Sequence, residues 1–282
     1  TESNKTLALN AIISINPKVV AQAEELDGFQ AKGQHPIYGM PILLKDNINT
    51  KNMITTAGAV VLINNQTKTD AEIVTNLKSH GALILGKANL SEWANFLCDG
   101  CPNGYSAVGG QTLNPYGPGI FDTGGSSSGS AVSVAANYAV AAIGTETSGS
   151  ILSPSSQQSS VGLKPTVGVL SQEGIVPISS TLDTPGPITK TIRDNSIVFS
   201  AMASAKSGAA VPWEIDPRAD LKSLRFGVYT SYLKDSLYLR ALEDLKTLGA
   251  ELIEIDHKPM DFEGFTQLLS GDMKIDLANY LK

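Results

Sequence analysis

Three short stretches of the sequence carry residue types that could perform acyl transfer. Lys45 ends the apolar run Pro41–Lys45, Ser126 lies in the glycine- and serine-rich stretch GGSSSGS, and Ser150 lies in GTETSGSI. A serine hydroxyl becomes an effective nucleophile when a neighbouring base takes its proton. A lysine can be that base where burial lowers its pKa. Together the three stretches favour a site for acyl transfer over three unrelated structural features.

Each stretch, taken alone, also has a simpler explanation. Lys45 could emerge at the end of a strand and pair with Asp46, consecutive serines can be loop filler, and a Gly-Ser turn after a strand can be an ordinary turn. Successive backbone N–H groups in such a turn can, however, form an anion nest. Acyl transfer needs one, because negative charge develops on the carbonyl oxygen. The order of the three stretches favours the catalytic interpretation.

The sequence resembles the amidase signature family. The matching stretches occur in order and at matching spacing: GMPILLKDNI (39–48), GGSSSGSAVSVAA (124–136), GTETSGSI (144–151) and VGLKPTVG (161–168). Within the family the chain is most similar to the peptide amidases, through NLSEWANF (89–96), GGQTLNPY (109–116) and TLDTPGP (181–187). The resemblance implies an α/β protein with the amidase signature fold, in which helices cover both faces of a central mixed β-sheet.

The resemblance also implies a Ser–cis-Ser–Lys triad. Ser150 matches the nucleophile, Ser126 matches the serine whose preceding peptide bond is cis, and Lys45 matches the base. Thr145 and Ser127 match supporting positions. The oxyanion hole matches the backbone N–H groups of Thr147, Ser148, Gly149 and Ser150. Such a site hydrolyses a carbon–nitrogen amide bond through an acyl-enzyme on Ser150, and it requires no metal or cofactor.

The substrate is expected to be an uncharged small-molecule or peptide amide, such as a C-terminal peptide carboxamide. Many family members carry an arginine shortly after the nucleophile, where this chain has Leu152 and Ser153. A small acidic substrate or tRNA-bound glutamate is therefore disfavoured. The net charge of −6, without a dense basic cluster, disfavours a nucleic-acid or anionic-membrane partner.

Two other functions remain open at this point. Residues 125–129 satisfy G-x-S-x-G, the nucleophile elbow of α/β hydrolases, which would make Ser127 the nucleophile of an esterase and His257 its histidine. The second alternative is a non-catalytic relative that keeps the fold and only binds.

The order of expected elements alternates strands and helices, which implies an α/β sheet. We expect strands at 41–45, 82–87 and 139–146, β-like runs at 167–171 and 175–179, and a βαβ unit over 225–256. We expect helices at 7–26 (interrupted at Pro17), at 70–80 with Asp70 as its cap and Gly81 as its stop, from 89, at 130–138 and at 192–204. Residues 98–129 are expected to be loop.

The chain is expected to form a single amidase signature domain over residues 1–282 that lacks part of the N-terminal and C-terminal segments of its family, with a shortened segment at 207–219. No targeting signal is visible at its start, and no apolar run reaches the ~20 residues that span a bilayer. This slightly favours the cytoplasm and leaves the compartment open. Cys98 and Cys101 are expected to be a pair of loop thiols or a local disulfide rather than a redox motif or half of a metal site.

Overall fold

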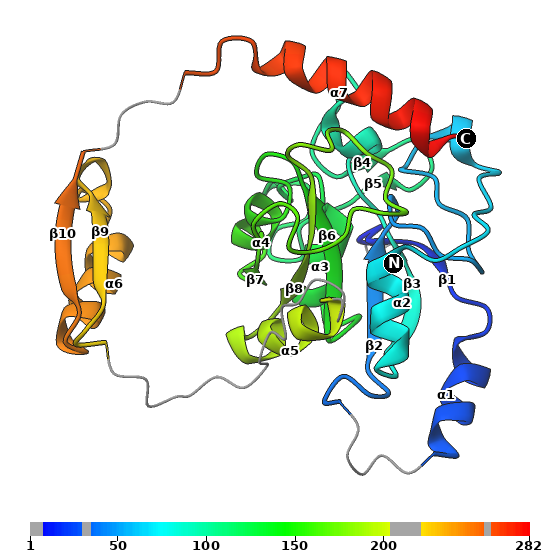
Figure 1. Ribbon diagram of the computed structural model, residues 1–282, viewed down its shortest axis with the longest axis horizontal. Helices are drawn as coiled ribbons and strands as arrows, with labels where there is room; N and C mark the ends of the chain where they lie inside the picture. Colours follow the sequence, from blue (N-terminus) through cyan, green and yellow to red (C-terminus); the bar gives the residue numbers. More distant parts are fainter. Residues whose placement is uncertain (1–7, 30–34, 204–220, 257–260) are drawn as a thin grey trace, which may run out of the picture. The chain divides into compact units, whose positions relative to one another are not determined.

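The computed structural model describes residues 8–29, 35–203, 221–256 and 261–282 (Figure 1). Its strands are β1 (Ile12–Ile15), β2 (Pro41–Lys45), β3 (Leu83–Ala88), β4 (Tyr105–Ser106), β5 (Gly110–Gln111), β6 (Ala141–Glu146), β7 (Val161–Gly162), β8 (Thr184–Thr189), β9 (Arg225–Tyr229) and β10 (Glu251–Ile255). Its α-helices are α1 (Val19–Asp27), α2 (Glu72–Ser79), α3 (Ser128–Ala135), α4 (Leu152–Gln157), α5 (Ile192–Met202), α6 (Ser236–Thr247) and α7 (Phe265–Tyr280).

The chain divides into two compact units, residues 1–214 together with 267–282, and residues 215–266. The first unit contains the main sheet, and the second contains β9, α6 and β10. The expectation of a single domain over residues 1–282 stays a prediction. Among the described residues, no helix is long and apolar enough to cross a membrane.

The main sheet has six strands in the order β1-β3-β2-β6-β8-β7. Strand β2 lies between β3 and β6 and runs parallel to both, whereas β1, β8 and β7 join by antiparallel pairing. The expected central mixed sheet is therefore confirmed. Its middle strand, β2, is the one that ends in Lys45.

Helices cover both faces of this sheet, and the side chains of β2 alternate between the two layers. Ile42 and Leu44 belong to the core cluster that includes residues of α2 and α5. Leu43 belongs to the second cluster, with Ala131 and Val134 of α3. A strand that is buried on both faces needs a continuous apolar run, which explains the sequence PILLK.

Helix α3 consists of small residues because it lies against backbone. A Cβ atom added at Gly129 would collide with the carbonyl oxygens of Asn89 and Ala11. Seven of the eight residues of α3 are buried, including three serines. The helix predicted over 130–138 is confirmed in part, because α3 begins earlier, at Ser128, and ends earlier, at Ala135. This close packing holds the loop before α3 near the ends of β2 and β6.

The predicted helix over 7–26 is wrong in its first half. Leu7 lies outside the described residues, and Ile12–Ile15 form β1, which pairs antiparallel with β3. Only the part after Pro17 is helical, as α1. Three isoleucines in four residues fit a pleated surface better than a helix once β3 supplies a partner. Helix α2 was predicted correctly, but its cap is not Asp70: Asp70 pairs with Lys78 at 2.7 Å instead.

Residues 89–96 do not begin a helix. They contain a short 3₁₀ turn, Glu92–Asn95, in which Trp93, Ala94 and Asn95 all have positive φ values of 50°, 54° and 71°. This left-handed conformation costs a non-glycine residue roughly 1–2 kcal/mol. Tertiary contacts, including the hydrogen bond from Trp93 N–H to the Ala57 carbonyl (2.9 Å), hold the turn in place.

The β-like runs predicted at 167–171 and 175–179 are not strands. Ile175 makes a single bridge with Ile48, and the strand that completes the sheet is β8 at 184–189. Its sequence, TPGPIT, holds two prolines, which disfavour a central strand. Strand β8 pairs with both β6 and β7, so tertiary pairing overrides the local preference.

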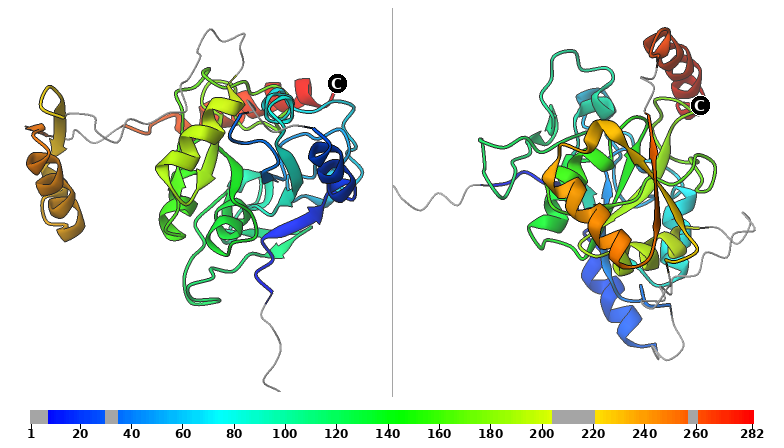
Figure 2. Two further views of the ribbon diagram at one scale, coloured as in Figure 1. Left: turned by 90° about the horizontal axis from the view of Figure 1, so that it is seen from below. Right: turned by 90° about the vertical axis from the view of Figure 1, so that its left-hand side faces the viewer.

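The predicted βαβ unit is confirmed, but it does not belong to the main sheet. Strands β9 and β10 pair with each other in parallel and form a separate two-stranded sheet. Figure 2 shows α6, drawn in orange in the right-hand view, beside these two strands.

A buried ion pair joins the ends of β2 and β3. The Nζ atom of Lys87 lies 3.4 Å from Oδ1 of Asp46, and neither side chain is more than 1% exposed. Lys87 also donates to the Ile48 carbonyl (2.5 Å) and the Thr55 hydroxyl (2.9 Å), while Asp46 accepts from the backbone and hydroxyl of Thr56. Asp46 therefore pairs with Lys87, not with Lys45.

Replacing Lys87 with methionine should destabilise the protein strongly, because it leaves the buried Asp46 without a counter-charge. The expected loss is about 3–5 kcal/mol in the free energy of unfolding, measured by urea denaturation. Lys78→Met is the control, since it breaks an ion pair at the surface and should cost less than about 1 kcal/mol. Equal losses for the two variants would show that the buried pair does not stabilise the sheet.

Candidate active site

Lys45 is fully buried at the end of β2 and makes three hydrogen bonds. Its Nζ atom donates to Ser126 Oγ (2.7 Å), Thr145 Oγ1 (2.9 Å) and the Thr145 carbonyl (3.1 Å). The Thr145 hydroxyl also accepts from Asn47 Nδ2 at 3.0 Å. Because β2 and β6 are neighbours, the ends of both strands converge on this ammonium group, and the loop before α3 brings Ser126 to it.

Burial lowers the pKa of Lys45 to about 7. The negative charges of Asp183 and Glu146 raise it, but the loss of hydration outweighs them. A lysine with a pKa near neutrality is substantially deprotonated at pH 7 and can accept a proton. Ser126, its nearest hydroxyl, is also fully buried.

Ser126 follows a cis peptide bond from Gly125. Its neighbour Ser127 is hydrogen-bonded to the backbone of Thr145 and Ser150. The Ser127 hydroxyl donates to the Thr145 carbonyl (3.1 Å) and accepts from the Thr145 N–H (3.2 Å). Its backbone N–H donates to the Ser150 carbonyl at 3.1 Å. A hydroxyl that is fully buried and committed in this way is poorly placed to attack a substrate. The nucleophile-elbow alternative, with Ser127 as nucleophile, also requires His257, which lies outside the described residues.

Ser150 ends a turn that leaves β6 and leads into α4. The turn begins at Thr147, passes through exposed Ser148 and turns at Gly149, whose φ is +86°. Ser150 itself is 8% exposed. Among the hydrogen bonds of the described residues, none uses the N–H of Ser148, Gly149 or Ser150 as donor. These three donors are therefore available to an anion.

Two carboxylates that the motif analysis did not single out hold this turn. Glu146 Oε2 accepts from the N–H groups of Ile151 (2.7 Å) and Leu152 (2.9 Å), just after Ser150. Asp183 accepts from the Thr147 hydroxyl at the start of the turn. Both acids lie within stretches that carry the family resemblance. Their roles could not be read from the sequence, because each acts on backbone or hydroxyl groups brought close only by the fold.

A cavity of about 210 Å³ opens beside the turn. Thr145 and Thr147 line it on the catalytic side, and the segment 174–178 and three residues of α7 line it elsewhere. Ala94, from the left-handed turn, also contributes. Asp183 and Asp276 line the cavity, whereas no lysine, arginine or histidine among the described residues does. The cavity therefore disfavours a negatively charged ligand.

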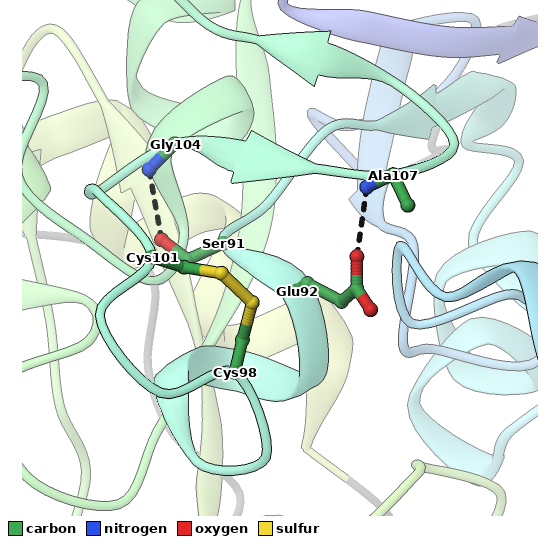
Figure 3. Close-up of a disulfide and its surroundings, with 6 residues drawn as sticks. All are labelled: Ser91, Glu92, Cys98, Cys101, Gly104 and Ala107. Carbon is green, nitrogen blue, oxygen red and sulfur yellow. Dashed lines mark hydrogen bonds between the residues drawn. A yellow bond between two sulfur atoms is a disulfide. The ribbon is translucent and has the colours of Figure 1, made fainter.

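The segment between Ser91 and Gly104 carries the disulfide between Cys98 and Cys101 (Figure 3). Ser91 fixes this segment to the site, because its hydroxyl accepts from the Gly104 N–H (2.8 Å) and its N–H donates to the Ser126 carbonyl (3.0 Å). Of the two expected states of the cysteines, the structure has the local disulfide. Among the described residues, no cluster of His, Cys, Asp and Glu could hold a metal ion.

Comparison with known proteins identifies the family. The family model described as Amidase matches residues 3–270. The chain belongs to the amidase family. The amidase signature resemblance inferred from the motifs is thereby confirmed, together with the fold class.

Individual relatives agree with this membership. A protein of Arabidopsis thaliana named a probable amidase is 49% identical over 191 residues, covering 66% of this chain and 37% of that protein. The native peptide amidase from Stenotrophomonas maltophilia is 37% identical, with a TM-score of 0.82 over 96% of this chain and 60% of that one. A glutamyl-tRNA(Gln) amidotransferase subunit of Lawsonia intracellularis is 36% identical over 88% of this chain and 53% of its own length. The chain thus spans roughly one third to three fifths of the length of these relatives.

Proposed function

We propose that the protein is a serine amidase in which Ser150 is the nucleophile, Ser126 relays protons and Lys45 is the general base. The observation that carries the proposal is the buried Lys45 ammonium, 2.7 Å from the Ser126 hydroxyl, with its pKa lowered to about 7. Membership of the amidase family supports the same chemistry.

In the proposed reaction, neutral Lys45 takes the proton of Ser126, which takes the proton of Ser150. The Ser150 oxygen then bonds to the amide carbon, and the unused N–H groups of the turn stabilise the resulting oxyanion. As the carbon–nitrogen bond breaks, Ser126 returns a proton to the leaving amine. Water cleaves the acyl-enzyme by the same route. The two serine hydroxyls make no hydrogen bond to each other in the described structure, and such relays often tighten only when substrate binds.

The proposed substrate is a neutral amide, the C-terminal carboxamide of a peptide. The similarity to peptide amidase structures supports it, as do the acidic residues of the cavity and the absence of an arginine at Leu152 and Ser153. A carboxylate-bearing substrate would meet Asp183 and Asp276 without a compensating cation among the described lining residues.

A fluorophosphonate probe should modify Ser150 alone, because the activated hydroxyl lies beside the free N–H donors. The measurement is mass-spectrometric mapping of the labelled peptide. Ser150→Ala should abolish labelling, whereas Ser127→Ala should leave the label on Ser150. Modification of Ser127 in the unaltered protein would instead support the nucleophile-elbow alternative.

Lys45→Met should lower kcat by at least about 10²-fold at pH 7 while the protein stays folded, because the base is lost and the stem volume is largely kept. In the unaltered enzyme, kcat/KM should fall as the pH drops through about 7, since a protonated Lys45 cannot accept a proton. Lys190→Met, at the surface, is the matched control. Near-native turnover by Lys45→Met would assign the base to another group.

Blocked peptide amides should be hydrolysed faster than malonamate or free glutamine, with release of ammonia. Comparing kcat/KM for the three substrates tests this expectation, because only the first presents a neutral amide without a nearby carboxylate. Faster turnover of either acidic compound would refute the substrate proposal but leave the amidase chemistry intact.

A further inference from the structure

We propose that Asp183 is a positioning residue of this site, which holds the turn Thr147–Ser150 against the cavity wall and carries a negative charge that acts on Lys45. The inference rests on the proposed function, because it assigns a role within that reaction. Asp183 does not take part in the proton relay, and it acts through Thr147 and Lys45.

The side chain of Asp183 joins two separate segments. One oxygen, Oδ1, accepts from the hydroxyl of Thr147. The other, Oδ2, accepts from the N–H groups of Ile178 (2.8 Å) and Ser179 (3.0 Å). The residue is 9% exposed, so water competes little for these bonds. Asp183 therefore links the first residue of the candidate oxyanion turn to the segment that walls the cavity.

The far side of that wall is held in the same way by α7. Asp272 accepts from the hydroxyls of Ser179 (2.6 Å) and Thr181 (2.7 Å), and Asp276 accepts from the Ser180 N–H (2.7 Å). The segment 178–181 is thus fixed between Asp183 on one side and two carboxylates on the other. A wall fixed on both sides gives Thr147 a rigid support.

The N–H groups of Ile178 and Ser179 can only donate, so Oδ2 of Asp183 accepts from both. The Thr147 hydroxyl can donate or accept, and it donates to Oδ1 when the carboxyl is ionised. Burial raises the pKa of Asp183, and the hydrogen bonds from Thr147, Ser179 and Ile178 oppose that change. Asp183 is taken as ionised near neutral pH, because these hydrogen bonds and the positive charge of Lys45 favour the carboxylate.

This charge acts on Lys45 together with few others. Glu146, at the end of β6, also raises the pKa of Lys45, while helix α3, packed against the same strands, carries no titratable residue. Asp46 and Lys87, on the adjoining strand ends, neutralise each other in an ion pair. Removing the charge of Asp183 should therefore lower the pKa of Lys45, so that the base stays neutral at lower pH.

Asp183→Asn in the full chain tests both parts of the proposal. We expect kcat to fall about tenfold or more, with a smaller change in KM, because the turn is less well fixed for the transition state. The acidic limb of the kcat/KM profile should move to lower pH by about 0.5–1 unit. Thr147→Val should reproduce the loss in kcat without the shift, since it removes the hydroxyl but keeps the charge.

Asp272→Asn is the matched control, because it loosens the same wall without removing a charge that acts on Lys45. It should change KM and leave the acidic limb in place. An equal shift of the limb in Asp183→Asn and Asp272→Asn, or an unchanged kcat and limb in Asp183→Asn, would overturn the proposal.

A second measurement separates this inference from the proposed function. The pKa of Lys45 can be followed by NMR titration of its ¹³Cε signal, which needs no turnover. A lower pKa in Asp183→Asn than in the unaltered protein supports the charge effect even if no amide is hydrolysed. An unchanged pKa contradicts it even if the enzyme is active and Ser150 is labelled.

Discussion

The burial of Lys45 beside Ser126 is the constraint on which the rest of the site depends. An ammonium group in a dry interior is costly unless it is hydrogen-bonded, paired or deprotonated. Strand β2 buries it because β3 and β6 flank the strand and helices cover both faces. Thr145 and Ser126 supply the acceptors. The central place of β2 in the sheet thereby sets the chemistry of its last residue.

Two neighbouring buried lysines have different partners. Lys87 lies against Asp46 and is compensated by an opposite charge at 3.4 Å. Lys45 has no carboxylate within ion-pair distance among the described residues, and its contacts are hydroxyl and carbonyl oxygens. Burial lowers the pKa of both lysines, and Asp46 opposes this change at Lys87. Lys45 differs in its contacts, because its Nζ atom lies 2.7 Å from the Ser126 hydroxyl.

Local sequence patterns predicted correctly the elements whose local preference matches their environment in the fold. The apolar run PILLK predicts a buried strand, and the small residues of α3 predict a helix packed closely against its neighbours. The predictions failed where a distant partner decides the structure. Ile12–Ile15 form a strand because they pair with β3, and TPGPIT forms one because it pairs with β6 and β7. The left-handed turn at Trp93 depends on contacts such as the hydrogen bond to Ala57. Long-range pairing of this kind leaves no periodic signal in the segment itself.

The site shows the same division between local and distant information. Lys45, Ser126 and Ser150 were inferred from motifs. The contacts of Glu146 could not be inferred in this way, because they depend on which backbone N–H groups of the folded turn reach its carboxylate. Glu146 takes the N–H groups of Ile151 and Leu152, while those of Ser148 to Ser150 donate to no acceptor among the described residues. A carboxylate so close to an oxyanion site would be unfavourable if it competed for the same donors. Because it is satisfied by the two donors that follow, it fixes the end of the turn and leaves the earlier donors free for the proposed oxyanion.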